Sequence, residues 1–396
     1  MAVVTIENLD IVFGNNQAKT LPLMDQGQTR DQIIGLTGDV VGVQNANIEI
    51  NEGEICVLMG LSGSGKSTLL RAINGLNKVA RGRCLVRDGD KMVDMAKCDE
   101  ATLRHMRTHR VSMVFQSFAL MPWLTVLENV AFGLEMQGMG KAERLIKARE
   151  QLKMVSLDQW ADKKPDELSG GMRQRVGLAR AFAMDTDVLL MDEPFSALDP
   201  LIRTQLQDEL IELQKRLNKT IIFVSHDLDE ALKIGTKIAI MESAKIIQED
   251  SPEQIVLNPA TEYVEKFVAH TNPLNVLRGD SLMTPVKELT VEGDRTYLDK
   301  DTWLELSDGK LTSVQDQNGE IPTAIWNPGM ALDDVPNNTV LKVPANIQMR
   351  DAVEIRYHSN RFMVLEEYEQ CVGILGDHNF YHALLGKHFS RDLEET

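Results

Sequence analysis

Short apolar runs recur along the first two thirds of the chain, and most of them are followed at once by a polar side chain. They occupy residues 55–59, 111–115, 188–191 and 220–224. Runs of this kind are typical of strands that are buried on both faces of a parallel sheet. An amphipathic pattern such as that of residues 201–217 adds helices that can cover the sheet. The pattern therefore predicts an α/β fold with ligands at the carboxyl ends of the strands.

Two alternating segments precede the first buried run. Residues 3–13 and 43–50 alternate apolar and polar side chains, which indicates edge or half-buried strands. A polar insertion, residues 14–42, separates them and contains a candidate short helix over residues 29–34. The N-terminal part is therefore expected to be two strands with an insertion between them.

The first buried run leads into a glycine-rich segment, residues 60–67, which has the spacing of a phosphate-binding loop. Its glycines let successive N–H groups point at a phosphate, and the start of the next helix adds to that positive field. Lys66 is expected to reach the β- and γ-phosphates, and Ser67 to place its hydroxyl on Mg²⁺. A turn that merely joins strand to helix is the alternative, which the flanking segments disfavour. The candidate nucleotide contacts here are Gly60, Ser62, Gly63, Ser64, Gly65, Lys66, Ser67 and Thr68.

Polar residues that follow the later runs are the next candidates. Asp192 is placed to complete the Mg²⁺ shell, while Glu193 points to where an attacking water would stand. Gln116 or His226 alone would more often be structural than functional. Three such strand ends in one sheet favour a contact between His226 and the γ-phosphate.

A second anion site is predicted at residues 169–171. Ser169, Gly170 and Gly171 open a helix, so exposed N–H groups and the positive end of the helix dipole are available there. A single chain has no obvious second phosphate for this site.

Two apolar features have more than one interpretation. The loop tract 118–123 is either a docking surface for a partner or a hinge packed on its own domain. Phe13 is the only early aromatic side chain that could stack on adenine, and a place in the core fits the pattern equally well.

Composition narrows the classes of function. The 396 residues include 42 basic and 59 acidic side chains, and the net charge of -17 would repel nucleic acid over most of the surface. No stretch reaches the roughly 18 to 20 uncharged apolar residues of a membrane helix, and the N-terminus lacks a secretory signal. The four cysteines have no paired spacing and are interpreted as reduced structural thiols. We expect a cytoplasmic protein, unless a partner holds it at a membrane, and no nucleic-acid partner.

Taken in order, these motifs resemble the nucleotide-binding subunit of an ATP-binding cassette (ABC) transporter over residues 1 to about 270. The match comprises the phosphate loop, Gln116, the signature 168–172, the acidic strand 188–193, residues 196–199 and His226. The resemblance implies a P-loop domain with a mixed sheet, a helical subdomain at about 117–180, and bound ATP and Mg²⁺. It also implies that two copies pair head to tail, so that the signature of one copy contacts the γ-phosphate held by the other.

The resemblance assigns a role to each site residue. Glu193 would polarise the attacking water, His226 would hold its geometry and the γ-phosphate, and Lys66 would neutralise charge, so these three are the predicted catalytic residues. Mg²⁺ would be organised by Ser67, Gln116 and Asp192. The nucleotide contacts added to the phosphate loop are Gln116, Ser169, Gly170, Gly171, Asp192 and Asp199.

Three features are similar to the branch of this family that imports quaternary amines such as glycine betaine, proline betaine and choline. They are Met172, where many members have glutamine, the insertion 14–42 and the tract 118–122. The resemblance implies an ATP hydrolase at the cytoplasmic face of the cell membrane, with a permease and an extracytoplasmic substrate-binding protein as partners.

Other functions are less compatible with the chain. An importer subunit for another small solute is the nearest alternative. A soluble cassette protein acting on DNA or ribosomes would carry coiled coils, a duplicated cassette or a basic surface. A small-molecule kinase has no use for a second anion site or for the paired acids at Asp192 and Glu193.

Residues 271–396 are expected to form a small α+β domain. Short β-like runs between residues 282 and 325 are separated by the turns 307–309 and 317–319. Residues 349–375 predict a helix and two strands, which is similar to a degenerate cystathionine-β-synthase (CBS) module. A small β-barrel or a plain dimerisation appendage is the alternative. We expect an accessory or regulatory domain.

Overall fold

The computed structural model describes residues 1–116, 119–196, 198–269, 271–293, 295–298, 301–327, 330–331 and 334–385. The chain divides into two compact units, residues 1–251 and 252–396. The predicted boundary lies at about 270, whereas α10 (Pro252–Leu257) and α11 (Glu262–Val268) belong to the second unit of the structure. Leu257 packs against the core of that unit, which explains the assignment.

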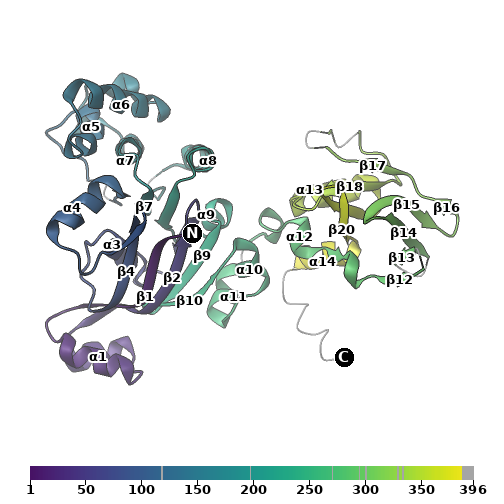
Figure 1. The fold of residues 1–396 in the computed structure, drawn as a ribbon, viewed down its shortest axis with the longest axis horizontal. Coiled ribbons are helices and arrows are strands. Elements are labelled where there is room, and N and C mark those ends of the chain that lie inside the picture. Colours follow the sequence, from purple (N-terminus) through teal and green to yellow (C-terminus); the bar gives the residue numbers. More distant parts are fainter. Residues whose placement is uncertain are drawn as a thin grey trace. The chain divides into compact units, whose positions relative to one another are not determined.

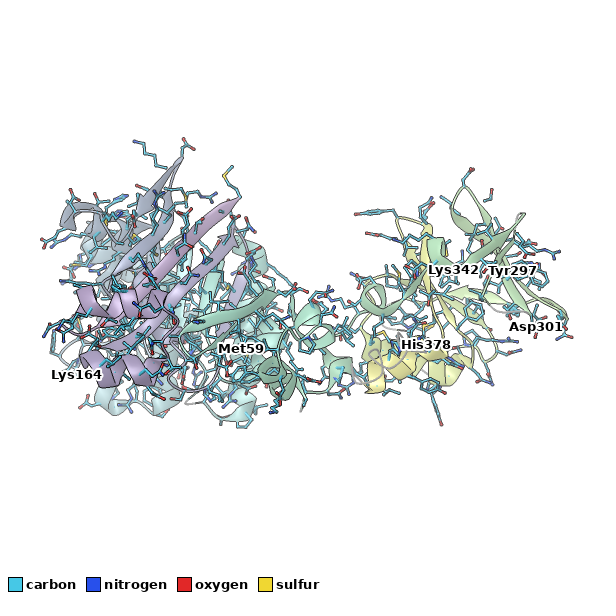
Figure 2. All side chains as sticks on the ribbon, turned by 90° about the horizontal axis from the view of Figure 1, so that it is seen from below. Met59, Lys164, Tyr297, Asp301, Lys342 and His378 are labelled. Carbon is cyan, nitrogen blue, oxygen red and sulfur yellow. The ribbon has the colours of Figure 1, made fainter. Side chains whose placement is uncertain are left out.

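The main sheet of the first unit has six strands in the order β10-β9-β3-β8-β7-β6, of which Figure 1 labels β7, β9 and β10. Strands β6, β7, β8, β3 and β9 are parallel, and β10 runs antiparallel to β9. The predicted parallel sheet is therefore confirmed. Met59 closes β3 and is fully buried (Figure 2). The bounds are β3 (Ile55–Met59), β6 (Val111–Val114), β7 (Val188–Asp192), β8 (Thr220–Val224), β9 (Lys237–Glu242) and β10 (Lys245–Asp250).

A second, antiparallel sheet has the order β2-β1-β4-β5. One core cluster joins it to the main sheet, because Leu69, Leu70 and Ile73 of α3 (Lys66–Ile73) are buried together with side chains of both sheets. The bounds are β1 (Ala2–Phe13), β2 (Val40–Asn51), β4 (Arg81–Asp88) and β5 (Lys91–Asp94). The phosphate loop thus leads into a helix that is held by both sheets.

The insertion between β1 and β2 forms two helices, α1 (Gln17–Asp25) and α2 (Arg30–Thr37). Thr29 and Gln32 make a reciprocal capping box that begins α2, and the left-handed Gly38 follows its last turn. Ile33 and Met24 pack on Val12 and Val41 of the strands. The candidate helix 29–34 is confirmed and extends one turn further, because the sequence analysis stopped before the glycine cap.

A group of helices packs around a core of its own within residues 125–184. Helices α5 (Val126–Met136), α6 (Lys141–Met154) and α7 (Gly170–Ala183) share one buried apolar cluster, and Figure 1 shows α5 beside α6. Thr125 and Glu128 form the capping box that begins α5. The remaining helices of the first unit are α4 (Glu100–His109), α8 (Pro200–Leu217) and α9 (Leu228–Ile234), with the 3-10 turns η1 (Asp158–Trp160) and η2 (Pro165–Glu167).

The second unit contains two five-stranded sheets. One has the mixed order β11-β20-β19-β18-β17, and the other is an antiparallel meander from β12 to β16. Buried side chains of both sheets form one cluster, which includes Leu304, Val314, Val340 and Val364.

The strands of the second unit are β11 (Thr284–Pro285), β12 (Thr290–Glu292), β13 (Arg295–Tyr297), β14 (Thr302–Ser307), β15 (Lys310–Asp316), β16 (Gly319–Glu320), β17 (Thr323–Ile325), β18 (Val340–Pro344), β19 (Met363–Glu367) and β20 (Gln370–Leu375). The helices are α12 (Gly279–Leu282), α13 (Met349–Ser359) and α14 (Asp377–Leu385), with the turns η3 (Pro273–Asn275) and η4 (Val286–Glu288). The predicted helix-strand-strand order is confirmed as α13, β19 and β20. The turn 307–309 joins β14 to β15, with φ of 50° at Asp308 and 75° at Gly309.

The cysteines are free among the described residues, and three of them are buried: Cys56, Cys84 and Cys371. Burial raises the pKa of the Cys84 thiol to about 12 and that of Cys371 to about 11. In the part of the chain that the structure describes, no helix combines the length and the apolar character needed to cross a membrane.

Candidate functional site

The phosphate loop connects β3 to α3, and its backbone requires glycine. Gly60 and Gly65 have φ of 139° and 106°. A Cβ on Gly60 would lie 2.1 Å from the carbonyl oxygen of Met241, and one on Gly65 would lie 2.4 Å from that of Gly42. No side chain caps the first turn of α3, so its N–H groups are available to an anion.

Lys66 and Ser64 are buried polar side chains inside this loop. Lys66 is 6% exposed, and its Nζ donates to the carbonyl oxygens of Gly60, at 2.7 Å, and Leu61, at 2.9 Å. Burial lowers the pKa of the Lys66 ammonium, and the charges of Glu193 and Asp192 oppose that shift. The Oγ of Ser64 is buried without a partner. A phosphate group would supply the partner that Ser64 lacks and an acceptor for the third N–H group of Lys66, so the loop fits a nucleotide.

Asp192 ends β7 and is fully buried. It accepts a hydrogen bond from Ser67 Oγ at 2.7 Å and one from Arg71 Nη2 at 2.8 Å. The structure thus brings together two of the three predicted Mg²⁺ ligands, and hydroxyl and carboxylate oxygens are the donors that this ion prefers. Arg71 was not among the predicted site residues, although it follows Ser67 by one helical turn and so lies on the same face of α3.

Glu193 is the centre of a second group of polar side chains. Its Oε2 accepts from Gln116 Nε2 at 3.1 Å, and its Oε1 lies 3.7 Å from His226 Nδ1. The Glu193 backbone has a φ of 48°, a left-handed conformation that glutamate rarely adopts. The predicted strand-end residues therefore meet at one edge of the sheet, as the parallel arrangement requires.

A buried network positions the segment that carries His226. Glu230 is 8% exposed and accepts hydrogen bonds from Ser225 Oγ and, at 3.0 Å, from Gln207 Nε2. Burial raises the pKa of Glu230, and the two hydrogen bonds act in the opposite direction. The network attaches Ser225, the residue before His226, to α8 through Gln207 and to α9 through Glu230. Sequence reasoning missed it because its members are 5 and 23 residues apart.

The predicted second anion site lies at the start of α7. Ser169 is its N-cap and accepts from the Met172 N–H at 3.3 Å. No hydrogen bond or ion pair of the described residues joins Ser169, Gly170 or Gly171 to the phosphate loop. Asp199 is the N-cap of α8, accepts from the Ile202 N–H at 3.1 Å, and likewise has no such bond to the loop. Within one chain the signature is therefore not joined to the nucleotide site.

The exposure of their side chains bears on the interpretation of two apolar features, Phe13 and the tract 118–123. Phe13 is 44% exposed, and its ring lies against Gly42, whose added Cβ would come within 2.7 Å of it. That exposure disfavours the core interpretation, and adenine stacking stays a prediction.

In the tract 118–123, Trp123 is 70% exposed while Leu120 packs on the helical cluster. Phe118, like Ala197 in the segment after β7, lies outside the described residues.

Arg30, at the start of α2, contacts the phosphate loop from outside. Its Nη1 donates to the carbonyl oxygen of Gly63 at 2.9 Å, and its Nε is buried without a partner. The contact spans 33 residues of sequence, and no spacing rule would have found it. The insertion therefore brings one more positive charge to the loop.

We expect Arg30→Ala to raise the KM for ATP by about threefold to tenfold, the effect of losing one charge-assisted hydrogen bond. The kcat should change little, because Arg30 contacts no predicted catalytic residue. Steady-state kinetics measures both constants. Arg30→Lys should recover part of the affinity, and Lys19→Ala, which removes a cation from an exposed site on α1, is the matched control. A fall in kcat with unchanged KM would contradict this role.

Comparisons with known proteins agree with this geometry. The family model described as "ABC transporter" matches residues 43–196. The glycine betaine/proline betaine transport system ATP-binding protein ProV of Escherichia coli (strain K12) is 53% identical over 262 residues, which are 66% of this chain and 64% of that protein. The match thus covers slightly less than two thirds of ProV.

Two further relatives extend the comparison. The glycine betaine transport ATP-binding protein OpuAA of Bacillus subtilis (strain 168) is 41% identical over 402 residues, which cover 99% of this chain and 95% of that protein. The dimeric structure of the ATP-binding cassette MJ0796, in a post-hydrolysis state with ADP and Pi, is 31% identical with a TM-score of 0.54, and it covers 63% of this chain and 98% of that chain. An identity of 41% along nearly the whole of both chains shows the relationship: this chain belongs to the ATP-binding subunits of ABC transporters.

Proposed function

We propose that the chain hydrolyses ATP to drive the import of a quaternary amine, such as glycine betaine, proline betaine or choline, through a membrane permease. The observation that carries this proposal is the 41% identity to OpuAA over 99% of the chain, which includes the second unit as well as the cassette. A match limited to the cassette would support ATP binding but would not indicate which class of solute is transported, since cassettes of this fold serve many transporters.

The chain's own residues supply most of the chemistry. Glu193 accepts a hydrogen bond from the attacking water and orients it, while Gln116 and His226 hold the Glu193 carboxylate from its two oxygens. Lys66 places a buried positive charge beside the β- and γ-phosphates. Ser67 and Asp192, joined by a 2.7 Å hydrogen bond, would hold Mg²⁺ together with Gln116. When bound, Mg²⁺ neutralises charge on the phosphate oxygens.

A second copy of the chain completes the site. The N-terminus of α7, with Ser169 as its cap, is an anion site that is not joined to the phosphate loop of its own chain. In a head-to-tail pair, Ser169, Gly170 and Gly171 contact the γ-phosphate held by the partner copy. ATP then lies between the two copies, and its hydrolysis lets them separate.

The permease holds the chain at the cytoplasmic face of the membrane in this proposal. Trp123, 70% exposed beside α5, gives the tract 118–123 an apolar surface for that contact. An extracytoplasmic binding protein would deliver the solute to the permease. The second unit would serve as a regulatory or dimerisation domain.

Reconstitution tests the proposal. The chain is placed in liposomes with its permease and the substrate-binding protein, and ATP turnover is measured with glycine betaine, choline or trimethylamine N-oxide. We expect one or more of these solutes to raise turnover severalfold, and maltose to have no effect. Stimulation by maltose or an amino acid but by no quaternary amine would refute the assigned solute class.

A further inference from the structure

A groove of about 290 Å³ lies in the first unit between α6 and α8. Its floor includes Leu189 and Ile221, at the amino ends of β7 and β8. The predicted nucleotide site lies at the carboxyl ends of the same strands, and none of its residues lines the groove. The groove is therefore a separate feature, for which the proposed function has no use.

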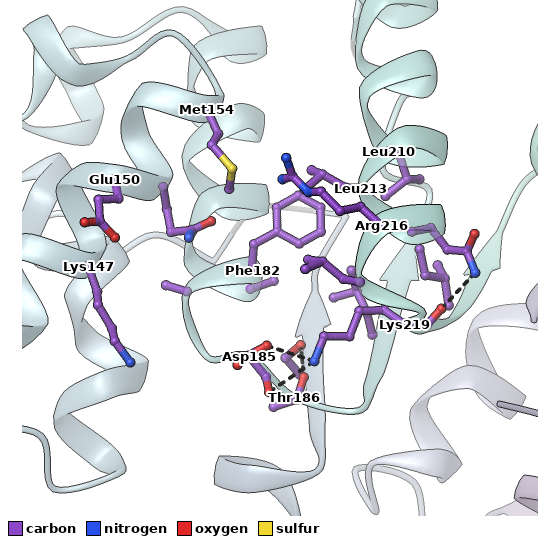
Figure 3. Close-up of a pocket in the computed structure, with 18 residues that line it drawn as sticks. Lys147, Glu150, Met154, Phe182, Asp185, Thr186, Leu210, Leu213, Arg216 and Lys219 are labelled. Carbon is purple, nitrogen blue, oxygen red and sulfur yellow. Dashed lines mark hydrogen bonds and ion pairs between the residues drawn. The ribbon is translucent and has the colours of Figure 1, made fainter. Parts of the chain in front are cut away.

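The floor of the groove is apolar and partly open to water. Phe182 lies in the middle, between the side chains of α6 and those of α8 (Figure 3). At its margin, Met154 is 38% exposed and Leu217 is 48% exposed. A smaller hollow shares Met154 and Phe182 and continues to Phe195. This surface offers burial to a flat apolar group.

One polar atom in the groove lacks a partner. The Oε1 of Gln151, on α6, is buried without a hydrogen bond. A buried acceptor in this state is unfavourable, because burial has removed its hydrogen bonds to water and nothing replaces them. A ligand with an N–H or O–H group can supply the missing bond.

The mouth of the groove carries cations although the chain has a net charge of -17. Lys147 on α6 and Arg216 on α8 line it, and neither makes an ion pair with any described residue. Lys219 is paired with Asp185 at 2.8 Å, and Glu150 is the other acidic residue of the lining. Figure 3 shows Arg216 extending from α8 toward Phe182. The two unpaired cations favour an anionic group.

We propose that this groove is a binding site for a small amphipathic anion. The ligand's flat apolar body lies on Phe182, its N–H or O–H group donates to Gln151, and its anionic group is held by Arg216, while Lys147 adds a more distant positive charge on the α6 side. A volume of about 290 Å³ is at the lower end of the range for ligand pockets, roughly 300–1,000 Å³, so the ligand is small. Bound there, it connects the helical subdomain to the sheet.

The probe 8-anilinonaphthalene-1-sulfonate has all three features: two aromatic groups, one N–H donor and one sulfonate. Its fluorescence rises when it leaves water, so titration of the full chain measures binding. We expect one saturable site per chain. Arg216→Glu should weaken binding by about tenfold, because an attraction is replaced by a repulsion, and Lys147→Glu by about threefold, because its charge is more distant. Arg149→Glu and Lys215→Glu make the same charge change on α6 and α8 at exposed positions outside the groove, and should change the affinity less than twofold.

Competition identifies the source of the anion. Displacement of the probe by indole-3-acetate, which has a flat ring, an N–H donor and a carboxylate, indicates a free carboxylate, and displacement by vesicles of phosphatidylglycerol indicates an anionic lipid; either result supports the site. Equal weakening by the groove and control variants, no saturable binding, or displacement by neither competitor would overturn it. The titration needs no nucleotide, so its outcome is independent of the ATPase proposal.

Discussion

The Glu193→Gln variant is expected to bind ATP as tightly as the parent chain and to hydrolyse it about a hundredfold to a thousandfold more slowly. The amide has the size of the carboxylate, so the contacts with Gln116 and His226 can persist. The amide cannot accept a proton from the attacking water, and it has no negative charge to hold that water in place. A positioned base typically accelerates a reaction by a factor of this size. Equilibrium binding of a fluorescent ATP analogue and release of phosphate measure the two properties.

Glu212→Gln is the matched control for this experiment. Glu212 is exposed on α8 and lines neither the site nor the groove, so that variant should hydrolyse ATP at the parent rate. Size-exclusion chromatography with ATP adds a second measurement, because a chain that holds ATP without cleaving it should accumulate as a dimer. Near-parent hydrolysis by Glu193→Gln would show that another group activates the water.

Two inactive variants are expected to restore activity to each other when they are mixed. Lys66→Ala removes the charge that we propose holds the phosphates, and Ser169→Asp places a negative charge where we propose that the partner's γ-phosphate lies. A mixed dimer has both defects in one site and an intact second site. With random pairing, half of the dimers are mixed, so the mixture should show roughly a quarter of the parent activity if each site works alone.

The choice of aspartate at position 169 separates chemistry from folding. Ser169 caps α7 by accepting from the Met172 N–H at 3.3 Å, and aspartate is an equally good N-cap. Thr125→Asp makes the corresponding cap exchange on α5 and should stay active. Activity of the mixture no greater than the sum of the separate variants would argue against a site shared between two copies.

The main sheet could be predicted because its central strands β3, β7 and β8 are almost wholly apolar. Residues 55–59 and 220–224 are buried on both faces in neighbouring parallel strands, which their composition indicated. Because parallel strands end at the same edge of a sheet, their order also predicted that Gln116, Glu193 and His226 lie close together. The ordering of motifs and the parallel topology were sufficient for this part of the site.

The supporting contacts could not be predicted, because they depend on tertiary distance. Arg30 meets Gly63 across 33 residues, and Gln207 meets Glu230 across 23. Neither spacing matches the period of a helix or a strand, so no local pattern in the sequence indicates the contact. The place of α10 in the second unit is a similar case, since only packing shows which core Leu257 joins.

The backbone of Glu193 has a consequence for the balance between stability and activity. A φ of 48° costs a glutamate about 1 kcal/mol, which glycine or asparagine would largely avoid. Selection for a stable fold alone would thus place another residue there. The chain retains a locally unfavourable conformation at the position where we propose that water is activated, so stabilising this turn by sequence redesign would come at the expense of turnover.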